Sequence, residues 1–234
     1  MEIGYIKGII KETESTRRFI IETSKSEIFD FVAGQLVQLG LEIHGRVSWR
    51  NYSISSMPDK TNTFELLITY KPDGLFSEYL FDTIQIGEMI FIEGPFGAFV
   101  LPRKIDKDIV FISTGSGISP FRSMLSYIVE NNIETKDVYL FFGCRTKKDI
   151  LYFEEMLRLT RVYPKFKYIP VLSREPWSGA NGYVQHHFPQ LISSLSEKPL
   201  VYLCGWSTML ADARIILKDM GLELGKDIKV ENFG

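Results

Sequence analysis

The stretch DIVFISTGSGISP (Asp108–Pro120) joins the apolar run IVFI to a glycine-rich turn and then to a helix-like segment. An apolar run without alternation is typical of a strand that both faces of a parallel sheet bury. Gly115 and Gly117 allow the backbone to approach a phosphate closely, and the N-terminus of the following helix offers N–H groups to it. The spacing is GxGxxP, so the usual dinucleotide fingerprint is not met. Two interpretations stay open, a phosphate loop and a tight turn without a ligand.

Further apolar runs follow this stretch and alternate with helix-like segments. The runs are DVYLFFG (137–143), FKYIPVLS (166–173), PLVYLCG (199–205) and DIKVENF (227–233). With the first run they predict a five-stranded parallel sheet covered by helices on both faces. Ligands of such sheets bind outside the carboxyl ends of the strands. Those ends carry STGSGISP (113–120), GCRT (143–146), SRE (173–175), CGWST (204–208) and ENFG (231–234).

The first part of the chain has a different pattern, with short alternating or β-branched runs separated by Gly, Asp and Pro. They lie at 2–13, 17–23, 28–34, 35–43, 64–70 and 88–94. Many short strands at close spacing predict an antiparallel β-barrel or sandwich. One helix-like piece, at 75–84, interrupts them. We therefore expect a β-barrel domain over residues 1–103 and an α/β domain over residues 104–234, divided near LPRKIDK.

Composition excludes several classes of protein. The net charge of −2 gives no reason to invoke nucleic acid or an anionic membrane, and no apolar run approaches the length of a membrane span. With only Cys144 and Cys204, no disulfide framework and no thiolate metal cluster is expected. His186 and His187 are adjacent, which is not the spacing of helical metal ligands. The N-terminus lacks a signal-peptide pattern, so we expect a cytoplasmic protein.

Two stretches of the first domain are also candidate anion sites. In RNYS (50–53), Arg50 and Tyr52 share one face of a strand, and together they suit a ligand that is both anionic and flat. In KPDGLFS (71–77), a glycine turn opens a helix, where backbone N–H groups and Lys71 are available to a phosphate. The simpler interpretations are surface decoration and a plain helix cap.

Taken together, these stretches resemble the ferredoxin–NADP reductase family of flavoenzymes. RNYS, GQLVQL (34–39), KPDGLFS, IGEMIFIEGPFGAF (86–99), STGSGISP, GCRTKKDILYFEE (143–155), SREPWSGANGYVQ (173–185), YLCGWSTM (202–209) and VENFG occur in the family's order and cover nearly the whole chain. The resemblance implies an FAD-binding barrel followed by an NAD(P)-binding α/β domain. It also implies hydride transfer between NAD(P)H and FAD, with electrons passing to a separate acceptor such as ferredoxin or flavodoxin.

The resemblance also implies the roles of individual residues. Arg50 meets the flavin pyrophosphate, Tyr52 packs on the flavin, and Ser53 approaches flavin N5. Cys204 lines the nicotinamide pocket, and Phe233 covers the flavin until the nicotinamide displaces it. The expected catalytic residues are Ser53, Cys204 and Phe233. The expected cofactor-binding residues are Arg50, Asn51, Tyr52, Ser53, Lys71, Gly74, Leu75, Phe76, Ser77, Thr114, Gly115, Ser116, Gly117, Pro120, Arg145, Ser173, Arg174, Tyr183, Cys204, Gly205 and Phe233.

The preference between NADP and NAD depends on the polar strand ends. Arg145, Ser173, Arg174 and Tyr183 suit a 2′-phosphate, which favours NADP. Asn181 and Gly182 stand where NADP-dependent relatives often have a basic residue. Two other functions stay open: a reductase component of an oxygenase, bearing FMN or FAD, and a non-catalytic nucleotide-binding subunit that relays electrons or senses the nucleotide.

Overall fold

The computed structural model describes residues 1–24 and 27–232. Contacts divide the chain into two compact units, Met1–Leu101 with Ser119–Glu130, and Pro102–Ile118 with Asn131–Gly234. Within the described residues, no helix is long and apolar enough to span a membrane.

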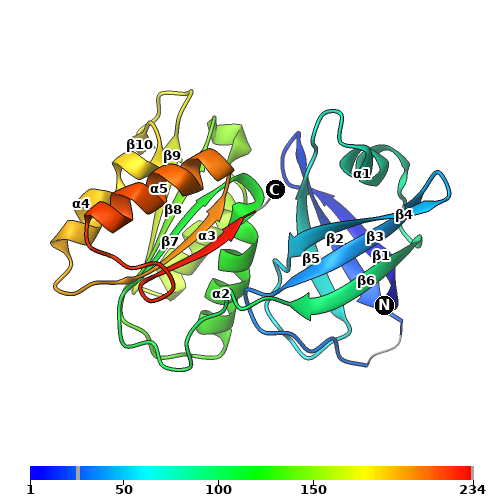
Figure 1. Cartoon of the computed structure of the whole chain (residues 1–234), viewed down its shortest axis with the longest axis horizontal. Helices are drawn as coiled ribbons and strands as arrows, with labels where there is room; N and C mark the ends of the chain where they lie inside the picture. Colours follow the sequence, from blue (N-terminus) through cyan, green and yellow to red (C-terminus); the bar gives the residue numbers. More distant parts are fainter. Residues whose placement is uncertain (25–26, 233–234) are drawn as a thin grey trace. The chain divides into compact units, whose positions relative to one another are not determined.

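The first unit is built on a six-stranded antiparallel sheet in the order β4-β3-β6-β1-β2-β5 (Figure 1). Its strands are β1 (Glu2–Lys11), β2 (Thr16–Thr23), β3 (Leu36–Ile43), β4 (Arg46–Ser53), β5 (Thr63–Thr69) and β6 (Met89–Phe96). The two edge strands meet through an isolated bridge between Ile54 and Leu66, and Ser55 N–H donates to the Glu65 carbonyl at 2.8 Å. These bonds close the sheet, which confirms the predicted barrel.

The interior of the barrel is filled by the alternating residues of its strands. In β3, for example, Val37, Leu39, Leu41 and Ile43 are all buried. The helical piece predicted at 75–84 forms α1 (Leu75–Glu78) and a π-helical turn, η1 (Tyr79–Thr83).

The prediction of a strand at 28–34 is wrong. Phe29, Phe31 and Ala33 alternate and are buried, but no strand is assigned there and a backbone bond from Phe29 to Thr61 ties the segment down. The segment buries every second side chain, as a strand does, but its backbone does not form a ladder of hydrogen bonds with a neighbouring strand.

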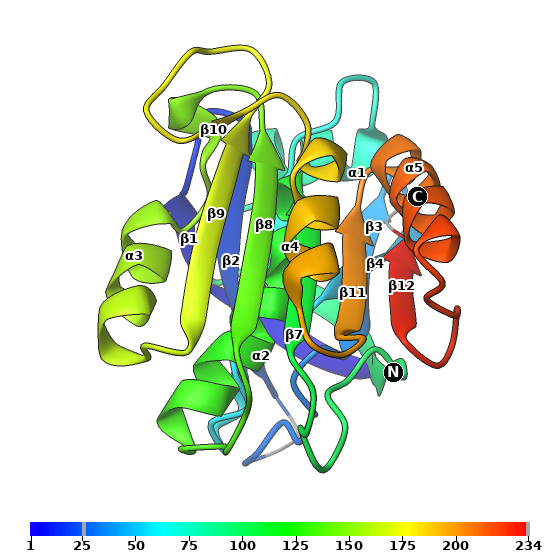
Figure 2. The same ribbon diagram turned by 90° about the vertical axis from the view of Figure 1, so that its left-hand side faces the viewer.

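The second unit contains a parallel sheet in the order β10-β9-β8-β7-β11-β12, and Figure 2 shows its strands side by side. The strands are β7 (Ile109–Thr114), β8 (Val138–Cys144), β9 (Phe166–Leu172), β10 (Ala180–Asn181), β11 (Leu200–Gly205) and β12 (Ile228–Asn232). Five of these confirm the predicted strands. The sixth, β10, has only two residues, too few to produce a hydrophobic pattern.

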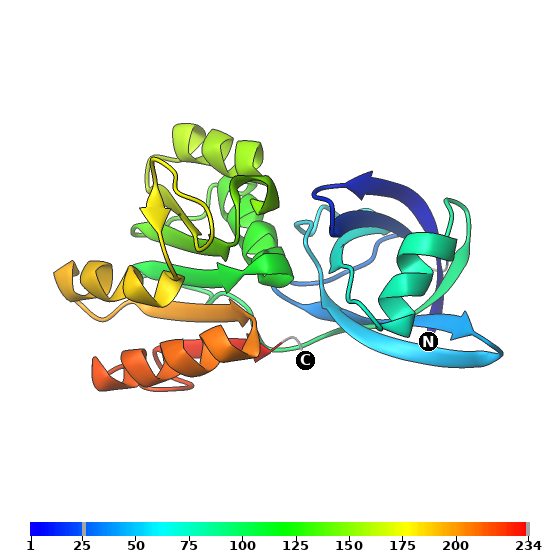
Figure 3. The same ribbon diagram turned by 90° about the horizontal axis from the view of Figure 1, so that it is seen from above.

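Helices cover both faces of this sheet. The helices of the unit are α3 (Phe153–Val162), α4 (Phe188–Ser194) and α5 (Ser207–Asp219), with short turns η2 (Gly115–Ile118), η3 (Lys147–Asp149) and η4 (Val184–His186). Figure 3 shows α3 on one face and α4 and α5 on the other. Val110, Ile112 and Leu203 pack with α4 and α5 in one core cluster. Strand order reverses between β7 and β11, so the loops that follow these two strands lie at the switch point, where ligands bind.

Helix α2 (Ser119–Glu130) follows η2 directly in sequence, yet its contacts place it in the first unit. Phe121, Met124, Leu125 and Ile128 form its fully buried stripe, at the spacing of one helical face. The expected domain boundary after residue 103 stays a prediction.

Candidate cofactor-binding sites

The end of β4 in the first unit brings a cation and two aromatic rings together. Arg50 and Tyr52, two residues apart, both lie beside Phe76: the Arg50 guanidinium carbon is 5.7 Å from the centroid of the Phe76 ring, and the Tyr52 ring is 6.1 Å from it. Arg50 is exposed, and one of its N–H groups donates to the Trp49 carbonyl at 2.7 Å. Burial raises the pKa of Tyr52 more than the Arg50 charge lowers it, so the phenol stays neutral. The arrangement suits a flat anionic ligand.

Ser53 ends β4 and pairs with Leu36 of β3; its side chain is buried. Asn51 precedes Tyr52 and is exposed.

The turn Lys71–Ser77 is held by the buried hydroxyl of Ser77. Ser77 Oγ accepts the Lys71 N–H at 3.0 Å and donates to the Gly74 carbonyl at 3.0 Å. A Cβ on Gly74 would lie only 2.9 Å from the Lys71 carbonyl oxygen, so the turn requires glycine there. Leu75 and Phe76 follow as the first residues of α1, with Leu75 exposed and Phe76 buried. The Ser77 hydroxyl is therefore used to hold the turn together. A ligand at this turn would be bound by backbone groups.

The loop after β7 packs tightly against the end of β11. A Cβ on Gly117 would collide with the Cys204 carbonyl oxygen and would lie 2.6 Å from its carbon and 2.7 Å from Gly205 Cα. The Trp206 N–H donates to Thr114 Oγ1 at 3.0 Å, which ties the two loops together. Gly115 and Ser116 are partly exposed between these anchors, whereas Pro120 is buried in α2. Close packing against β11 therefore requires glycine at position 117, and the binding of a phosphate by this loop stays a prediction.

Cys204 lies in register with Ser113 of β7 and with Glu231 of β12. Burial, together with the negative charge of Glu231, raises the pKa of the Cys204 thiol well above its usual range. The thiol is therefore protonated at neutral pH and cannot serve as a thiolate nucleophile. Glu231 is not among the residues predicted for the site from the sequence. A charged residue at the carboxyl end of an otherwise apolar strand is the signal that identifies it.

Two arginines lie at neighbouring strand ends on the other side of β7. The backbone N–H of Arg174 donates to the backbone carbonyl of Arg145 at 2.9 Å, and the backbone N–H of Ser173 donates to the backbone carbonyl of Cys144 at 3.0 Å. Arg145 and Arg174 are both exposed. Tyr183, which is 58% exposed, follows β10, whose residue Asn181 pairs with Leu172 at the end of β9. The structure therefore gathers the residues predicted for a 2′-phosphate at one corner of the sheet.

Asn181 has a structural role in this corner. Its side-chain amide donates to the carbonyls of Trp177 at 3.2 Å and Gly179 at 2.8 Å. The Trp177 indole closes the same loop by donating to the Ala180 carbonyl at 2.7 Å. The departure from the family pattern at residue 181 is thus explained by the fold of this loop.

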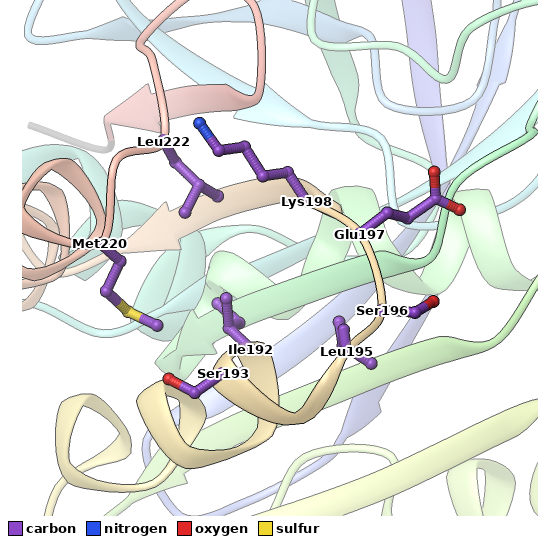
Figure 4. Close-up of a pocket in the computed structure, with 8 residues that line it drawn as sticks. All are labelled: Ile192, Ser193, Leu195, Ser196, Glu197, Lys198, Met220 and Leu222. Atoms are coloured by element: carbon purple, nitrogen blue, oxygen red, sulfur yellow. The ribbon is translucent and has the colours of Figure 1, made fainter.

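A cavity of about 380 Å³ lies elsewhere in the second unit (Figure 4). It is lined by Ile192, Ser193, Leu195, Ser196, Glu197, Lys198, Met220 and Leu222. Lys198 precedes β11, so this cavity is at the amino end of the sheet, opposite the strand ends that carry the candidate residues.

Two family models together match most of the chain. Residues 5–101 match the family model of the oxidoreductase FAD-binding domain, and residues 111–214 match that of the oxidoreductase NAD-binding domain. Ferredoxin–NADP reductase B of Sorangium cellulosum is 34% identical over 227 residues, which cover 93% of this chain and 91% of that protein. The chain belongs to the ferredoxin–NADP reductase-like family of oxidoreductases.

A solved relative of this reductase supports its two cofactors. A ferredoxin–NADP reductase from Neisseria gonorrhoeae with bound FAD and NADP superposes with a TM-score of 0.83 at 26% identity, over 99% of this chain and 98% of that one. The anthranilate 1,2-dioxygenase electron transfer component of Acinetobacter baylyi is 29% identical over 93% of this chain, and the chain spans 63% of that protein's length. The reductase is thus a flavoprotein with FAD and a nicotinamide dinucleotide as its cofactors, and the match to the FAD model favours FAD over FMN.

The residues present fit both cofactors. The first unit offers an exposed guanidinium, a half-buried phenol and a glycine turn that a Cβ would fill. The second unit offers the loop Thr114–Gly117 and the two arginines. Phe233 lies outside the described residues, so its role stays a prediction, as do the roles of the other candidate residues.

Proposed function

We propose that this reductase oxidises NADPH and delivers the electrons through FAD to a separate acceptor protein, a ferredoxin or a flavodoxin. The observation that carries the proposal is the set of complementary sites in one chain: a cation with aromatic rings at the end of β4, and a glycine loop with an arginine pair in the second unit. The 34% identity to a ferredoxin–NADP reductase over 91% of its length supports the choice of acceptor.

In the first unit, Arg50 and the backbone of Gly74–Ser77 bind the flavin pyrophosphate, and Lys71 adds positive charge. Tyr52 packs its neutral ring against the flavin, and Ser53 places its hydroxyl near the reacting end of the ring. FAD, when bound, accepts a hydride from the nicotinamide and can release the two electrons singly or as a pair. The chain's own contribution is binding and orientation.

In the second unit, Thr114–Gly117 binds the nucleotide phosphates, and Gly205 with Cys204 forms the floor beneath the nicotinamide. The protonated thiol is fully buried in that floor, where it packs as a small, polarisable and uncharged group. Its proton stays on Sγ through the neutral range, so Cys204 acts through packing beneath the nicotinamide and not as a base.

The preference for NADPH is assigned to Arg145 and Arg174. Replacing Arg174 by alanine should raise the KM for NADPH by about 10-fold or more, because a charge-assisted bond to a phosphate is lost. The KM for NADH should change little. Arg161→Ala, an exposed arginine in the last turn of α3, is the matched control. An equal effect of Arg174→Ala on both nucleotides would refute the assignment.

The reaction itself is tested by the visible spectrum of the purified protein under anaerobic conditions, before and after NADPH is added. Flavin bands that bleach on addition are the expected result. Protein that binds no flavin after reconstitution with FAD, or flavin that no nicotinamide nucleotide bleaches, would contradict the proposal.

The second candidate acceptor is the terminal component of an oxygenase. It is favoured by the similarity to the dioxygenase electron transfer component and to a glycine betaine monooxygenase reductase subunit of Chromohalobacter salexigens, which is 29% identical over 97% of this chain. NADPH oxidation that depends on added ferredoxin or flavodoxin supports the first candidate. Reduction of an oxygenase component without either carrier supports the second.

A further inference from the structure

Four charged side chains form a continuous network in the first unit. Arg18 Nε is 2.8 Å from Glu12 Oε1, and Arg18 Nη1 is 2.9 Å from Glu65 Oε1. The other oxygen of the Glu65 carboxylate, Oε2, is 2.5 Å from Nη1 of Arg122. Glu65 therefore bridges an arginine of β2 to an arginine of helix α2.

The network is largely shielded from water. The side-chain exposures of Arg122, Glu65, Arg18 and Glu12 are 12%, 19%, 21% and 16%. Ion pairs that are buried to this degree are screened less by salt than surface pairs, and they become costly when one partner is removed. Glu65 and Arg122 thus hold each other in a defined geometry.

Helix α2 is also bonded to the segment that follows β4. Arg122 Nη1 donates to the Ser55 carbonyl at 2.9 Å, and Ser123 Oγ donates to the Ser56 carbonyl at 2.6 Å. Ser55 lies two residues after Ser53, the last residue of β4. The first turns of α2 therefore fix the chain immediately beyond the residues that we assign to the flavin.

The N-terminus of α2 continues directly from the loop that we assign to the nucleotide phosphates, Thr114–Gly117. η2 ends at Ile118 and α2 begins at Ser119, without an intervening residue. The family model of the NAD-binding domain includes α2, whereas its contacts place it in the first unit. A helix that continues the nucleotide loop is thus held by charges of the flavin-binding unit.

We propose that Arg122 and Glu65 are positioning residues for hydride transfer, acting through α2 on the phosphate loop and through Ser55 on the end of β4. This inference rests on the proposed function. Because the loop ends where α2 begins, a shift of α2 moves the end of the loop. Misplacement by about 1 Å can reduce a reaction rate on the order of 100-fold.

The test compares Arg122→Met with Arg18→Met in the holoprotein. Both variants remove one guanidinium from Glu65, but only Arg122→Met removes bonds that hold α2, to Glu65 and to the Ser55 carbonyl. We expect Arg122→Met to slow flavin reduction by NADPH about 10- to 100-fold in anaerobic stopped-flow and to weaken NADP⁺ binding, measured by flavin difference absorbance. Arg18→Met should change both by less than about 2-fold, with FAD content retained in each.

Two further variants separate positioning from simple stabilisation. Arg122→Lys keeps the charge but loses the planar fork, so it should recover part of the lost reduction rate. Glu65→Gln keeps the shape and removes the negative charge, and it serves as the second variant if Arg122→Met does not fold. It should lower the reduction rate in the same direction while FAD stays bound.

The inference is overturned if Arg122→Met reduces its flavin at the wild-type rate, or if Arg18→Met lowers rate and NADP⁺ affinity as much as Arg122→Met does. A wild-type protein whose flavin NADPH does not bleach would instead refute the proposed function, so the two failures are distinguishable.

Discussion

Replacing Gly117 by alanine places a methyl group where the loop after β7 meets the end of β11. The new Cβ would lie 2.6 Å from the Cys204 carbonyl carbon and 2.7 Å from Gly205 Cα, where an ordinary contact needs 3.4 Å or more. The loop must therefore move away by at least about 0.8 Å, because the neighbouring atoms are backbone atoms and cannot rotate aside. Overpacking of this kind costs about 1–3 kcal/mol.

If that cost falls on the nucleotide-binding conformation, the dissociation constant for NADP⁺ rises by about 5- to 150-fold. Titration of the holoprotein with NADP⁺, followed by the flavin difference spectrum, measures it. Gly8→Ala is the control, since its Cβ would meet only the flexible end of the Ile20 side chain at 3.0 Å. Wild-type affinity in Gly117→Ala would refute the assignment of this loop to the nucleotide.

Three further predictions concern the flavin turn, a thiol and the C-terminus. Ser77→Ala removes the acceptor of the Lys71 N–H and should weaken FAD binding by about 5-fold or more, measured by fluorimetric titration of apoprotein; unchanged affinity would contradict the role of this turn. Burial and the charges of Asp149 and Glu175 raise the pKa of Cys144 from 9.0 to about 12. The folded state then keeps a proton that the unfolded chain loses, so the free energy of unfolding should fall as pH rises from about 9 toward 12. Urea unfolding at pH 8 and 10 should show a smaller fall in Cys144→Ala, and an identical fall would argue against it. Deleting Phe233 and Gly234 should change the KM for NADPH, and unchanged kinetics would remove Phe233 from the site.

Much of the fold follows from hydrophobic pattern, because strands buried on two faces read as continuous apolar runs and strands buried on one face alternate apolar with polar residues. The same-face placement of Arg50 and Tyr52 also follows from the strand period, and the structure brings both to the Phe76 ring. The hydrophobic pattern predicts a strand wrongly where side chains are buried but the backbone does not pair, as at Phe29 and Phe31. It also fails for contacts between distant segments: the sequence around Arg122 does not show that it pairs with Glu65, and the sequence around Glu231 does not show that it lies beside Cys204.

The hydrogen bonds of the Asn181 side chain show a related limit of prediction from sequence. Sequence comparison registers only that a basic residue is missing there, whereas the structure shows that the amide closes its own loop. Whether a second group replaces the missing charge is a question of side-chain placement, which a linear motif does not contain.

The polarity of the parallel sheet has a practical consequence for building fusion proteins. Every residue assigned to the nicotinamide nucleotide in the second unit lies at or beyond the carboxyl end of a strand, whereas the cavity of Figure 4 and the connection between α4 and β11 lie at the amino end. Exposed residues of that connection, such as Ser196 and Lys198, offer an insertion point at the opposite end of the strands from the nucleotide loops. A reporter or an electron-carrier module grafted there would leave the loops after β7, β8, β9 and β11 untouched.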